Sequence, residues 1–472
     1  MGSFGRKILI QNRRRILVRK KKRTSPVTFR KDMLQKDLER LRAAYSLLRF
    51  THQSRYLELI NLHFERKKKI VLPDEKARIH FLFISPAFWP SYCGVFEACK
   101  SHPEIETAIV LLETEGTPVE LSSLRGARDF LDKNNIRYIP YNDYDILEQN
   151  PHIIVYNYPY NHIYHYFAQF SADSVKKLGV RPVYVHYGLE FDRPRETGML
   201  DFYHYQNYCQ ALAWKRFAIH KDVREGSFAK GYLGGSNVVA CGHPKFDRYY
   251  SGTNKPLPEA LTQKAAGRPL LVYRIHHPPT ELDYTYKNRT HSLPCKETIR
   301  ILRYLAKQED FCTAVLIHPL FASRVEKEHI MSQEEWLALK KMVQDSPNTY
   351  LHEGDYQPLL MNADYFITEM SSLMIEMAFF DKPILYLYDE PAYFKPFAED
   401  IIRSFFHGNS IYDVQLFLDR IRKGGKDGPK RSSASELQKL HRHGNISKYI
   451  AEKMINDIRI ESAEKLNSTQ YI

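Results

Sequence analysis

The chain has 472 residues, 43% of them apolar, and a formal net charge of +14 at pH 7. Its length exceeds that of one ordinary domain, and the absence of an apolar run of about eighteen residues excludes a membrane-spanning helix. The six cysteines lack Cys-x-x-Cys spacing, and the N-terminus lacks the apolar block of a secretory signal peptide. We therefore expect a large intracellular protein with reduced thiols, two cores and no metal or cofactor.

The positive charge is concentrated at the N-terminus. Eleven Lys or Arg residues lie between Met1 and Arg30, and the first carboxylate is that of Asp32. Unpaired charge at this density attracts polyanions, namely anionic lipid, nucleic acid or an anionic polymer product, and a tail that only aids solubility is the alternative. The basic run has no interleaved aromatic residues and no recognised binding module beside it. We expect an anionic membrane surface as partner and no nucleic acid.

An amphipathic helix is predicted from Asp32 to about Phe64. Apolar or aromatic residues recur there at helical spacing, at Leu34, Leu38, Leu41, Tyr45, Leu48 and His52. Such a helix packs on the rest of the chain, pairs with a second copy or lies on lipid. The sequence does not choose among these three.

From Arg78 onward, short apolar runs alternate with helix-like stretches, which predicts parallel sheets covered by helices on both faces. A segment rich in Gly, Pro, Ser and Lys interrupts the pattern and predicts an interdomain linker. The expected organisation is α/β, with two doubly wound, Rossmann-like domains facing a cleft. Its segments are a basic tail and helix at 1–77, an N-terminal domain at 78–250, a linker at 251–268, a C-terminal domain at 269–445 and a last helix at 446–472.

The most informative segment runs from Tyr365 to Asp389. It predicts a buried strand, a turn with the hydroxyls of Ser371 and Ser372, a helix and a second buried strand. Free N–H groups at a helix start suit a phosphate or pyrophosphate, and Glu376, one turn further, would accept hydrogen bonds from a ribose. The alternative is a serine cap followed by a glutamate that is satisfied within the protein.

Other polar residues follow apolar runs that we expect to be strands. They are His186, the turn from Gly242 to Asp247, the pair His276 and His277, and His318. Ligands of open α/β sheets bind beyond the carboxyl ends of strands, so we expect these residues at one cleft. Adjacent residues of a strand point to opposite faces, so the rings of His276 and His277 are predicted apart, which disfavours a metal site.

Several of these blocks together resemble the CDP-glycerol glycerophosphotransferases, the teichoic acid primases and polymerases and their capsule-forming relatives. The blocks are His352 to Tyr356, Asn362 to Ser372, Lys382-Pro383, Asp389 with Tyr393, Gly242 to Asp247, Ile317 to Leu320, and His276-His277-Pro278. The chain has Glu369-Met370 where the family usually has Asp-Tyr, and His186-Tyr187-Gly188-Leu189 where it has His-Gly-Thr-Pro. The resemblance implies a GT-B fold, in which the N-terminal domain binds the acceptor and the C-terminal domain binds the nucleotide donor. It also implies transfer of a polyol phosphate from a CDP-linked donor.

The resemblance, joined to the chemistry of phosphoryl transfer, assigns a role to each candidate residue. His186 is the predicted general base and His318 a catalytic contact to the donor phosphate, with Pro319 ending the strand. Donor-binding roles fall to Ser371, Ser372, Glu376, His276 and His277. Gly242, Asp247, Asp389 and Tyr393 either support the site or serve the fold alone.

Three hypotheses for function remain. The first is a transferase that moves glycerol or ribitol phosphate to a lipid-linked or polymeric anionic acceptor, on the cytoplasmic face of the membrane. The second is a GT-B glycosyltransferase that uses a sugar nucleotide, and the third is a scaffold without catalysis on the membrane surface. Fold alone does not separate them.

Overall fold

The structure is a computed structural model. It describes residues 55–113, 126–158, 167–192, 205, 207–230, 234–250, 255–278, 292–318, 321–322, 325, 329–424, 437–441 and 444–469. The basic run and the predicted helix up to residue 54 lie outside these ranges, and residues 55–67 are helical. No helix in the described ranges has the length and apolar character needed to cross a bilayer. The chain divides into two compact units, Met1–Leu59 and Ile60–Ile472, and both sheets belong to the second.

The first sheet has seven parallel strands in the order β3-β2-β1-β4-β5-β6-β7. The strands are β1 (Ala77–Phe83), β2 (Ile105–Leu111), β3 (Ile139–Pro140), β4 (Ile153–Tyr156), β5 (Arg181–Val185), β6 (Lys215–Ala218) and β7 (Val238–Ala240). The helices between them are α3 (Cys93–Lys100), α4 (Ala127–Lys133), α5 (Ile146–Gln149), α6 (Ala172–Lys177), α8 (Tyr208–Leu212) and α9 (Lys221–Lys230). The sequence did not predict β6, because Lys215 and Arg216 occupy half of its four residues.

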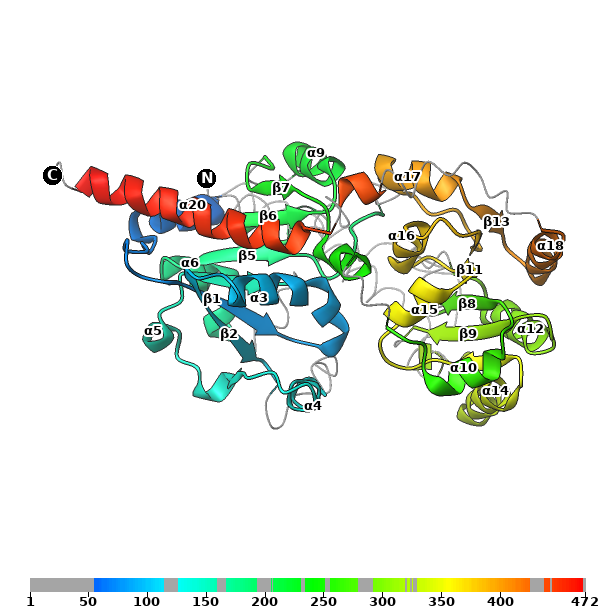
Figure 1. Ribbon diagram of the computed structural model, residues 1–472. Helices are drawn as coiled ribbons and strands as arrows, with labels where there is room; N and C mark the ends of the chain where they lie inside the picture. Colours follow the sequence, from blue (N-terminus) through cyan, green and yellow to red (C-terminus); the bar gives the residue numbers. More distant parts are fainter. Residues whose placement is uncertain are drawn as a thin grey trace, which may run out of the picture. The chain divides into compact units, whose positions relative to one another are not determined.

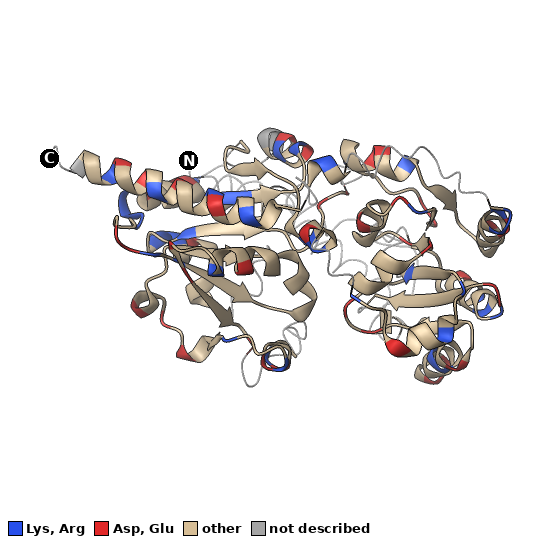
Figure 2. Ribbon diagram, in the orientation of Figure 1, with Lys and Arg blue, Asp and Glu red and all other residues tan. Residues whose placement is uncertain are grey.

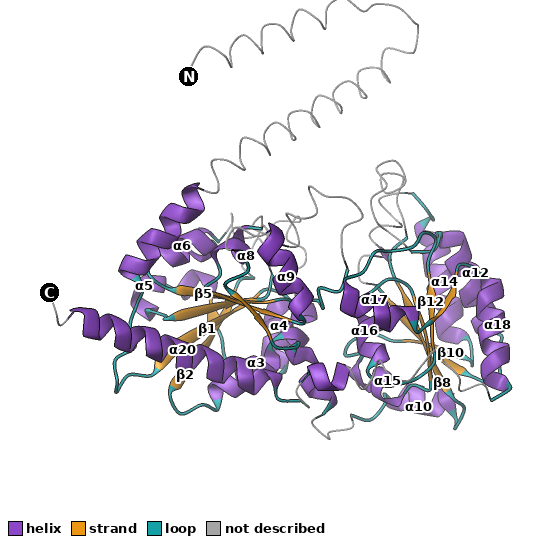
Figure 3. Cartoon of the chain, turned by 90° about the horizontal axis from the view of Figure 1, so that it is seen from above, coloured by secondary structure: helices purple, strands orange, loops and turns teal. Residues whose placement is uncertain are grey.

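Successive residues of these strands enter two separate hydrophobic clusters, which is why the strands are apolar throughout. Phe81 and Val183 pack with α3, α4 and the last helix, α20 (Ile446–Thr469), whereas Leu82 and Tyr184 pack with α5, α6 and α8. Figure 1 and Figure 3 show the helices on both faces. The alternation of apolar runs and helices in the sequence thus gave the correct architecture for this sheet.

The second sheet has six parallel strands in the order β10-β9-β8-β11-β12-β13. The strands are β8 (Leu270–Ile275), β9 (Cys312–Ile317), β10 (Thr349–Leu351), β11 (Tyr365–Thr368), β12 (Ile384–Leu387) and β13 (Phe406–Gly408). The helices are α10 (Glu259–Ala265), α12 (Cys295–Leu305), α14 (Gln333–Asp345), α15 (Gln357–Asn362), α16 (Leu373–Ala378), α17 (Pro396–Arg403) and α18 (Ile411–Arg422). The two sheets confirm the predicted doubly wound α/β fold.

The second sheet also has helices on both faces. Residues of α10, α15, α16 and α17 share one hydrophobic cluster, and residues of α12, α14 and α18 share another. Figure 2 shows the charged residues mainly on helices and loops, with the strands of this sheet largely free of charge. The segment predicted as an interdomain linker contains α10, whose Leu261 and Ala265 are buried. Its Pro and Gly residues therefore mark the ends of a helix.

The chain returns to the first sheet through α20. Asp247, in the 3-10 helix η7 (Pro244–Tyr249), accepts hydrogen bonds from the backbone N–H groups of Ile446 at 3.0 Å and Ser447 at 2.6 Å, and so caps the start of α20. Gly242 has φ +90°, and a Cβ atom there would lie 2.9 Å from the carbonyl oxygen of Leu440. Both residues therefore hold the turn where the last helix begins.

Candidate active site

The ends of β8, β9 and β11 lie side by side in the second sheet. The strand order reverses between β8 and β11, and open α/β sheets bind their ligands at such a switch point. The N–H of His318 donates to the carbonyl of Ile275 at 2.9 Å, and the N–H of Glu369 donates to that of Arg274 at 3.0 Å. The residues that follow β9 and β11 are thus hydrogen-bonded to the end of β8, which lies between those two strands.

Three imidazole rings gather at this edge. The ring centroids of His276 and His277 are 3.9 Å apart, and the ring of His318 lies 4.7 Å from the first and 5.2 Å from the second. The prediction that His276 and His277 point to opposite faces was wrong, because β8 ends at Ile275 and both residues lie beyond the strand. In the described part of the chain, no cluster of His, Cys, Asp or Glu has an arrangement suited to a metal ion.

The imidazole of His276 is uncharged at neutral pH. Burial lowers its pKa well below the ordinary value, and the neighbouring rings of His277 and His318 act in the same direction. Its Nδ1 lies 2.9 Å from the hydroxyl oxygen of Ser292, and His277 is 9% exposed. A neutral ring such as that of His276 can donate an N–H to an anionic oxygen without bringing a second buried charge.

Ser371 and Ser372 follow β11 on the neighbouring strand end. The hydroxyl of Ser371 accepts from the N–H of Leu373 at 3.2 Å, while Ser372 is the cap residue of α16 and makes no side-chain bond to the helix. Both serines are half-buried. They follow the strand beside the one that precedes His276 and His277, because β11 pairs with β8, where Thr368 is opposite Arg274.

Glu376 has partners within the protein. Its carboxylate is fully buried, lies 3.1 Å from the Nζ of Lys245, and accepts hydrogen bonds from the hydroxyls of Tyr249 and Tyr356. Lys245 and Tyr249 belong to η7, the segment that follows the first sheet. A ribose could bond to Glu376 only by displacing these groups. The structure therefore places Glu376 where it ties α16 to η7.

His186 follows β5 of the first sheet and is half-buried. Its Nδ1 lies 2.8 Å from the backbone nitrogen of Gly188 and 3.0 Å from the Gly188 carbonyl oxygen, and its ring stacks on Tyr187 at 4.8 Å. Burial lowers the pKa of His186, the carboxylate of Glu190 opposes that shift and Arg216 adds to it. The imidazole is consequently neutral at physiological pH, as a general base must be.

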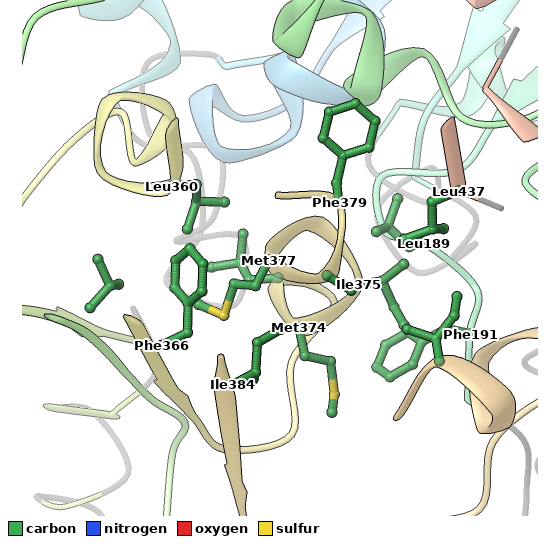
Figure 4. Packing of buried hydrophobic residues seen from close by; sticks show 14 of the residues in the cluster. Leu189, Phe191, Leu360, Phe366, Met374, Ile375, Met377, Phe379, Ile384 and Leu437 are labelled. Atoms are coloured by element: carbon green, nitrogen blue, oxygen red, sulfur yellow. The ribbon is translucent and has the colours of Figure 1, made fainter. Parts of the chain in front are cut away.

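The loop after His186 reaches the elements of the second sheet. Leu189 and Phe191 belong to the hydrophobic cluster that contains Met374 and Ile375 of α16, and Figure 4 shows them on the side of the helix that carries Ile375. The N–H of Lys395 also donates to the carbonyl of Phe191 at 2.8 Å. The predicted base and the predicted donor site therefore come from two sheets whose loops share one hydrophobic cluster.

The sequence profile of the family described as CDP-Glycerol:Poly(glycerophosphate) glycerophosphotransferase matches residues 206–455. That is more than half of the chain, and it includes His276, His277, His318 and both serines. The chain belongs to this glycerophosphotransferase family. The protein is therefore a transferase of the kind that acts on a CDP-linked donor.

A teichoic acid glycerol-phosphate primase from Bacillus spizizenii is 28% identical over 228 residues, which are 46% of this chain and 53% of the primase. The match thus spans about half the length of that relative. Its activity is accordingly a basis for a proposal about this chain.

Solved structures with the same fold include two nucleotide-binding enzymes and a polymerase. A variant of the wall teichoic acid polymerase TagF soaked with CDPG has a TM-score of 0.51 and 12% identity, over 91% of this chain and 98% of that one. MnaA of S. aureus with UDP and the UDP-GlcNAc 2-epimerase of Neisseria meningitidis with UDP-GlcNAc each have a TM-score of 0.51 and 12% identity, over 81% of this chain and 96% or 100% of theirs. At this identity the likeness shows the GT-B fold, as predicted.

Four further residues of this glycerophosphotransferase were predicted to support the site or to serve the fold. Asp389 and Tyr393 follow β12 and are exposed, whereas Gly242 and Asp247 lie at the start of α20 as described above. Pro319, expected to end β9, lies outside the described residues. The histidines and serines after β8, β9 and β11 are therefore the predicted residues that the second sheet brings together.

Sequence reasoning assigned no role to Lys245, Tyr249 or Tyr356, which surround Glu376. It also passed over Glu190 and Arg216, a buried ion pair close to His186. Burial raises the pKa of a carboxyl, yet Arg216 and His186 bring that of Glu190 down to about 2. The available signal was a Lys or Arg inside an otherwise apolar run, because such a residue needs a buried partner.

Proposed function

We propose that this protein transfers a polyol phosphate, glycerol or ribitol phosphate, from a CDP-linked donor to a hydroxyl of an anionic polymer or a lipid-linked acceptor. The observation that supports it most is the set of donor-side groups at the switch point of the second sheet, within the stretch matched by the family profile. Three imidazoles and two serine hydroxyls there suit the two phosphates of a nucleoside diphosphate.

In the proposed reaction, the acceptor oxygen attacks the phosphorus that bears the polyol, and His186 takes the hydroxyl proton on Nε2. The bond from that phosphorus to the bridging oxygen breaks, and CMP leaves with the electron pair. Nε2 can accept a proton only when Nδ1 carries one. The carbonyl of Gly188, 3.0 Å from Nδ1, would then receive that N–H, and the Gly188 N–H, which donates to Nδ1 at 2.8 Å in the structure, would have to turn away. His318, with His276 and His277, would contact the leaving phosphate.

The products of the reaction test this function. The purified protein is incubated with CDP-glycerol, CDP-ribitol and UDP-linked sugars together with a lipid-linked or polymeric acceptor, and the released nucleotide is identified. We expect CMP as the nucleotide product and a thermal shift with CDP that exceeds the shift with UDP. Release of CDP or UDP would instead indicate transfer of a glycosyl group, the second hypothesis.

The site of action that we propose is the cytoplasmic face of the cell membrane, where the protein would bind peripherally. The eleven Lys and Arg residues between Met1 and Arg30 support this, since each basic residue near an anionic surface contributes about 1 kcal/mol. The full chain should sediment with vesicles that contain anionic lipid and stay in solution with neutral ones. Equal sedimentation with both would count against the basic segment as the membrane contact.

A further inference from the structure

Arg274 is an unusual residue in the second sheet. Among the described strands β8 to β13 it is the one Lys, Arg, Asp or Glu. It is the fifth residue of β8, opposite Leu316 of β9 and Thr368 of β11. A charged side chain in the middle strands of a parallel sheet is costly to bury. Its presence there calls for a physical explanation.

The guanidinium is buried with few partners. Arg274 is 8% exposed, its Nη1 donates to the carbonyl of Leu316 at 3.3 Å, and its Nε has no hydrogen-bond partner among the described residues. Burial lowers its pKa to about 10, so the side chain stays charged at neutral pH. The backbone carbonyl offers only a partial negative charge in return.

A nearby carboxyl, that of Glu369, does not supply a counter-charge. It makes no ion pair with Arg274: its Oε1 accepts from the hydroxyl of Tyr273 at 3.3 Å, and burial raises the pKa of the carboxyl to about 8. Tyr273 and Arg274 are adjacent in β8 and so point to opposite faces of the sheet. The guanidinium of Arg274 thus lies on the face of the sheet opposite to Tyr273, and it makes no ion pair with a carboxylate of the described residues.

The other buried arginines of the described chain show the usual arrangement. Arg181 is fully buried and lies 2.8 Å from a carboxylate oxygen of Glu461, and Arg216, 2% exposed, is paired with Glu190. A buried cation without such a partner loses its hydration and gains little in exchange. Arg274 therefore has the properties of a residue whose counter-ion is a ligand.

We infer that Arg274 is a binding residue for the diphosphate of the nucleotide donor, between the histidines that follow β8 and β9 and the serines that follow β11. The inference rests on the proposed function and adds to it the one permanent positive charge among these groups. A guanidinium can bond two phosphate oxygens at once, and charge-assisted bonds of this kind are about twice as strong as neutral ones. The uncharged imidazole of His276 and the serine hydroxyls then add contacts without adding charge.

Binding of a graded series of ligands tests the inference. Affinities of the full chain for cytidine, CMP, CDP, UDP and inorganic pyrophosphate are measured by calorimetry for the wild type, Arg274→Gln and Arg274→Lys. We expect Arg274→Gln to weaken CDP binding at least tenfold, about 1.4 kcal/mol, to weaken CMP less, and to leave cytidine unchanged. Arg274→Lys should retain part of the affinity for CDP. Arg300→Gln, which removes an exposed guanidinium from α12, is the matched control and should change none of these values.

Thermal unfolding without ligand separates binding from a purely structural role. If the guanidinium of Arg274 has a counter-ion only when the ligand is bound, Arg274→Gln should unfold at the same temperature as the wild type or at a higher one. The substitution removes an uncompensated buried charge. Loss of stability together with unchanged CDP affinity in Arg274→Lys would overturn the inference. So would a folded Arg274→Gln that binds CDP as the wild type does.

The outcomes also distinguish this inference from the proposed function. If the wild type binds UDP and not CDP, the CDP-linked donor is wrong, and loss of UDP binding in Arg274→Gln would still support the diphosphate contact. If the wild type releases CMP from CDP-glycerol and Arg274→Gln binds CDP unchanged, the function stands and the inference fails. A wild type that binds neither diphosphate nor pyrophosphate contradicts both.

Discussion

Replacement of His186 by alanine is expected to lower kcat/KM for CMP release from CDP-glycerol by about 100- to 10,000-fold, the usual contribution of a general base. The proton of the acceptor hydroxyl then has no nearby acceptor, while the donor groups after β8, β9 and β11 stay intact. CDP affinity should consequently change little. Steady-state kinetics with saturating acceptor and calorimetry with CDP measure the two effects separately.

The pH profile gives a second readout of the same residue. Because burial lowers the pKa of His186 below its ordinary value of 6.5, the neutral base persists into weakly acidic solution. The acid limb of kcat/KM should therefore lie below that pH in the wild type and disappear in the variant. His102→Ala is the control, since His102 precedes β2 at the amino edge of the first sheet, away from His186. Full activity of His186→Ala, in vitro and in cells, would favour the scaffold hypothesis.

The sequence predicted the architecture well because it depends on a repeated physical pattern. Strands buried on both faces are continuous apolar runs, and each helix that covers them has helical periodicity, so the alternation from Arg78 onward indicated both sheets. The elements that were missed break the pattern locally. The strand β6 begins with Lys215-Arg216, and α10 lies between residues that are typical of a linker.

The candidate site was predicted only in part, for a reason that lies in its geometry. A residue after a strand can be assigned to the correct edge from sequence, which is how His318 and Ser371 were selected. The direction of a side chain beyond the last strand residue does not follow from strand alternation. The rings of His276 and His277 were therefore predicted on opposite faces, whereas the structure places their centroids 3.9 Å apart. Glu376 forms an ion pair with Lys245, which is 131 positions away in the chain. No local sequence pattern indicates a contact over that separation.

The contact between Lys245 and Glu376 explains how a junction segment can influence the donor site. Glu376 lies in α16, which begins directly after Ser371 and Ser372, and Lys245 lies in η7, which connects the first sheet to the rest of the chain. Both side chains are buried, with 7% and 0% exposure, and the hydroxyls of Tyr249 and Tyr356 complete the bonds to the carboxylate. A buried ion pair thus joins η7 to the helix that follows the serines.

Lys245→Met is expected to destabilise the protein by about 3 to 5 kcal/mol, because the fully buried carboxylate of Glu376 would lose its cation and could not be rehydrated. Glu376→Gln should cost a similar amount, since it leaves the ammonium of Lys245 buried without a counter-charge. Chemical denaturation, followed by circular dichroism and by intrinsic fluorescence, measures both values. Lys255→Met is the matched control, because its ion pair with Asp355 is 54% and 40% exposed and should contribute less than about 1 kcal/mol.

The double variant decides whether the two charges act as a pair. Lys245→Met combined with Glu376→Gln removes both, so no unpaired buried charge remains, and its destabilisation should fall well below the sum of the single values. Additive losses would mean that each side chain acts through other neighbours, such as Tyr249 and Tyr356. If the pair positions α16, the double variant should also regain stability without regaining CDP affinity, because neutral side chains can fill the space but do not restore the attraction that holds the serine turn against η7.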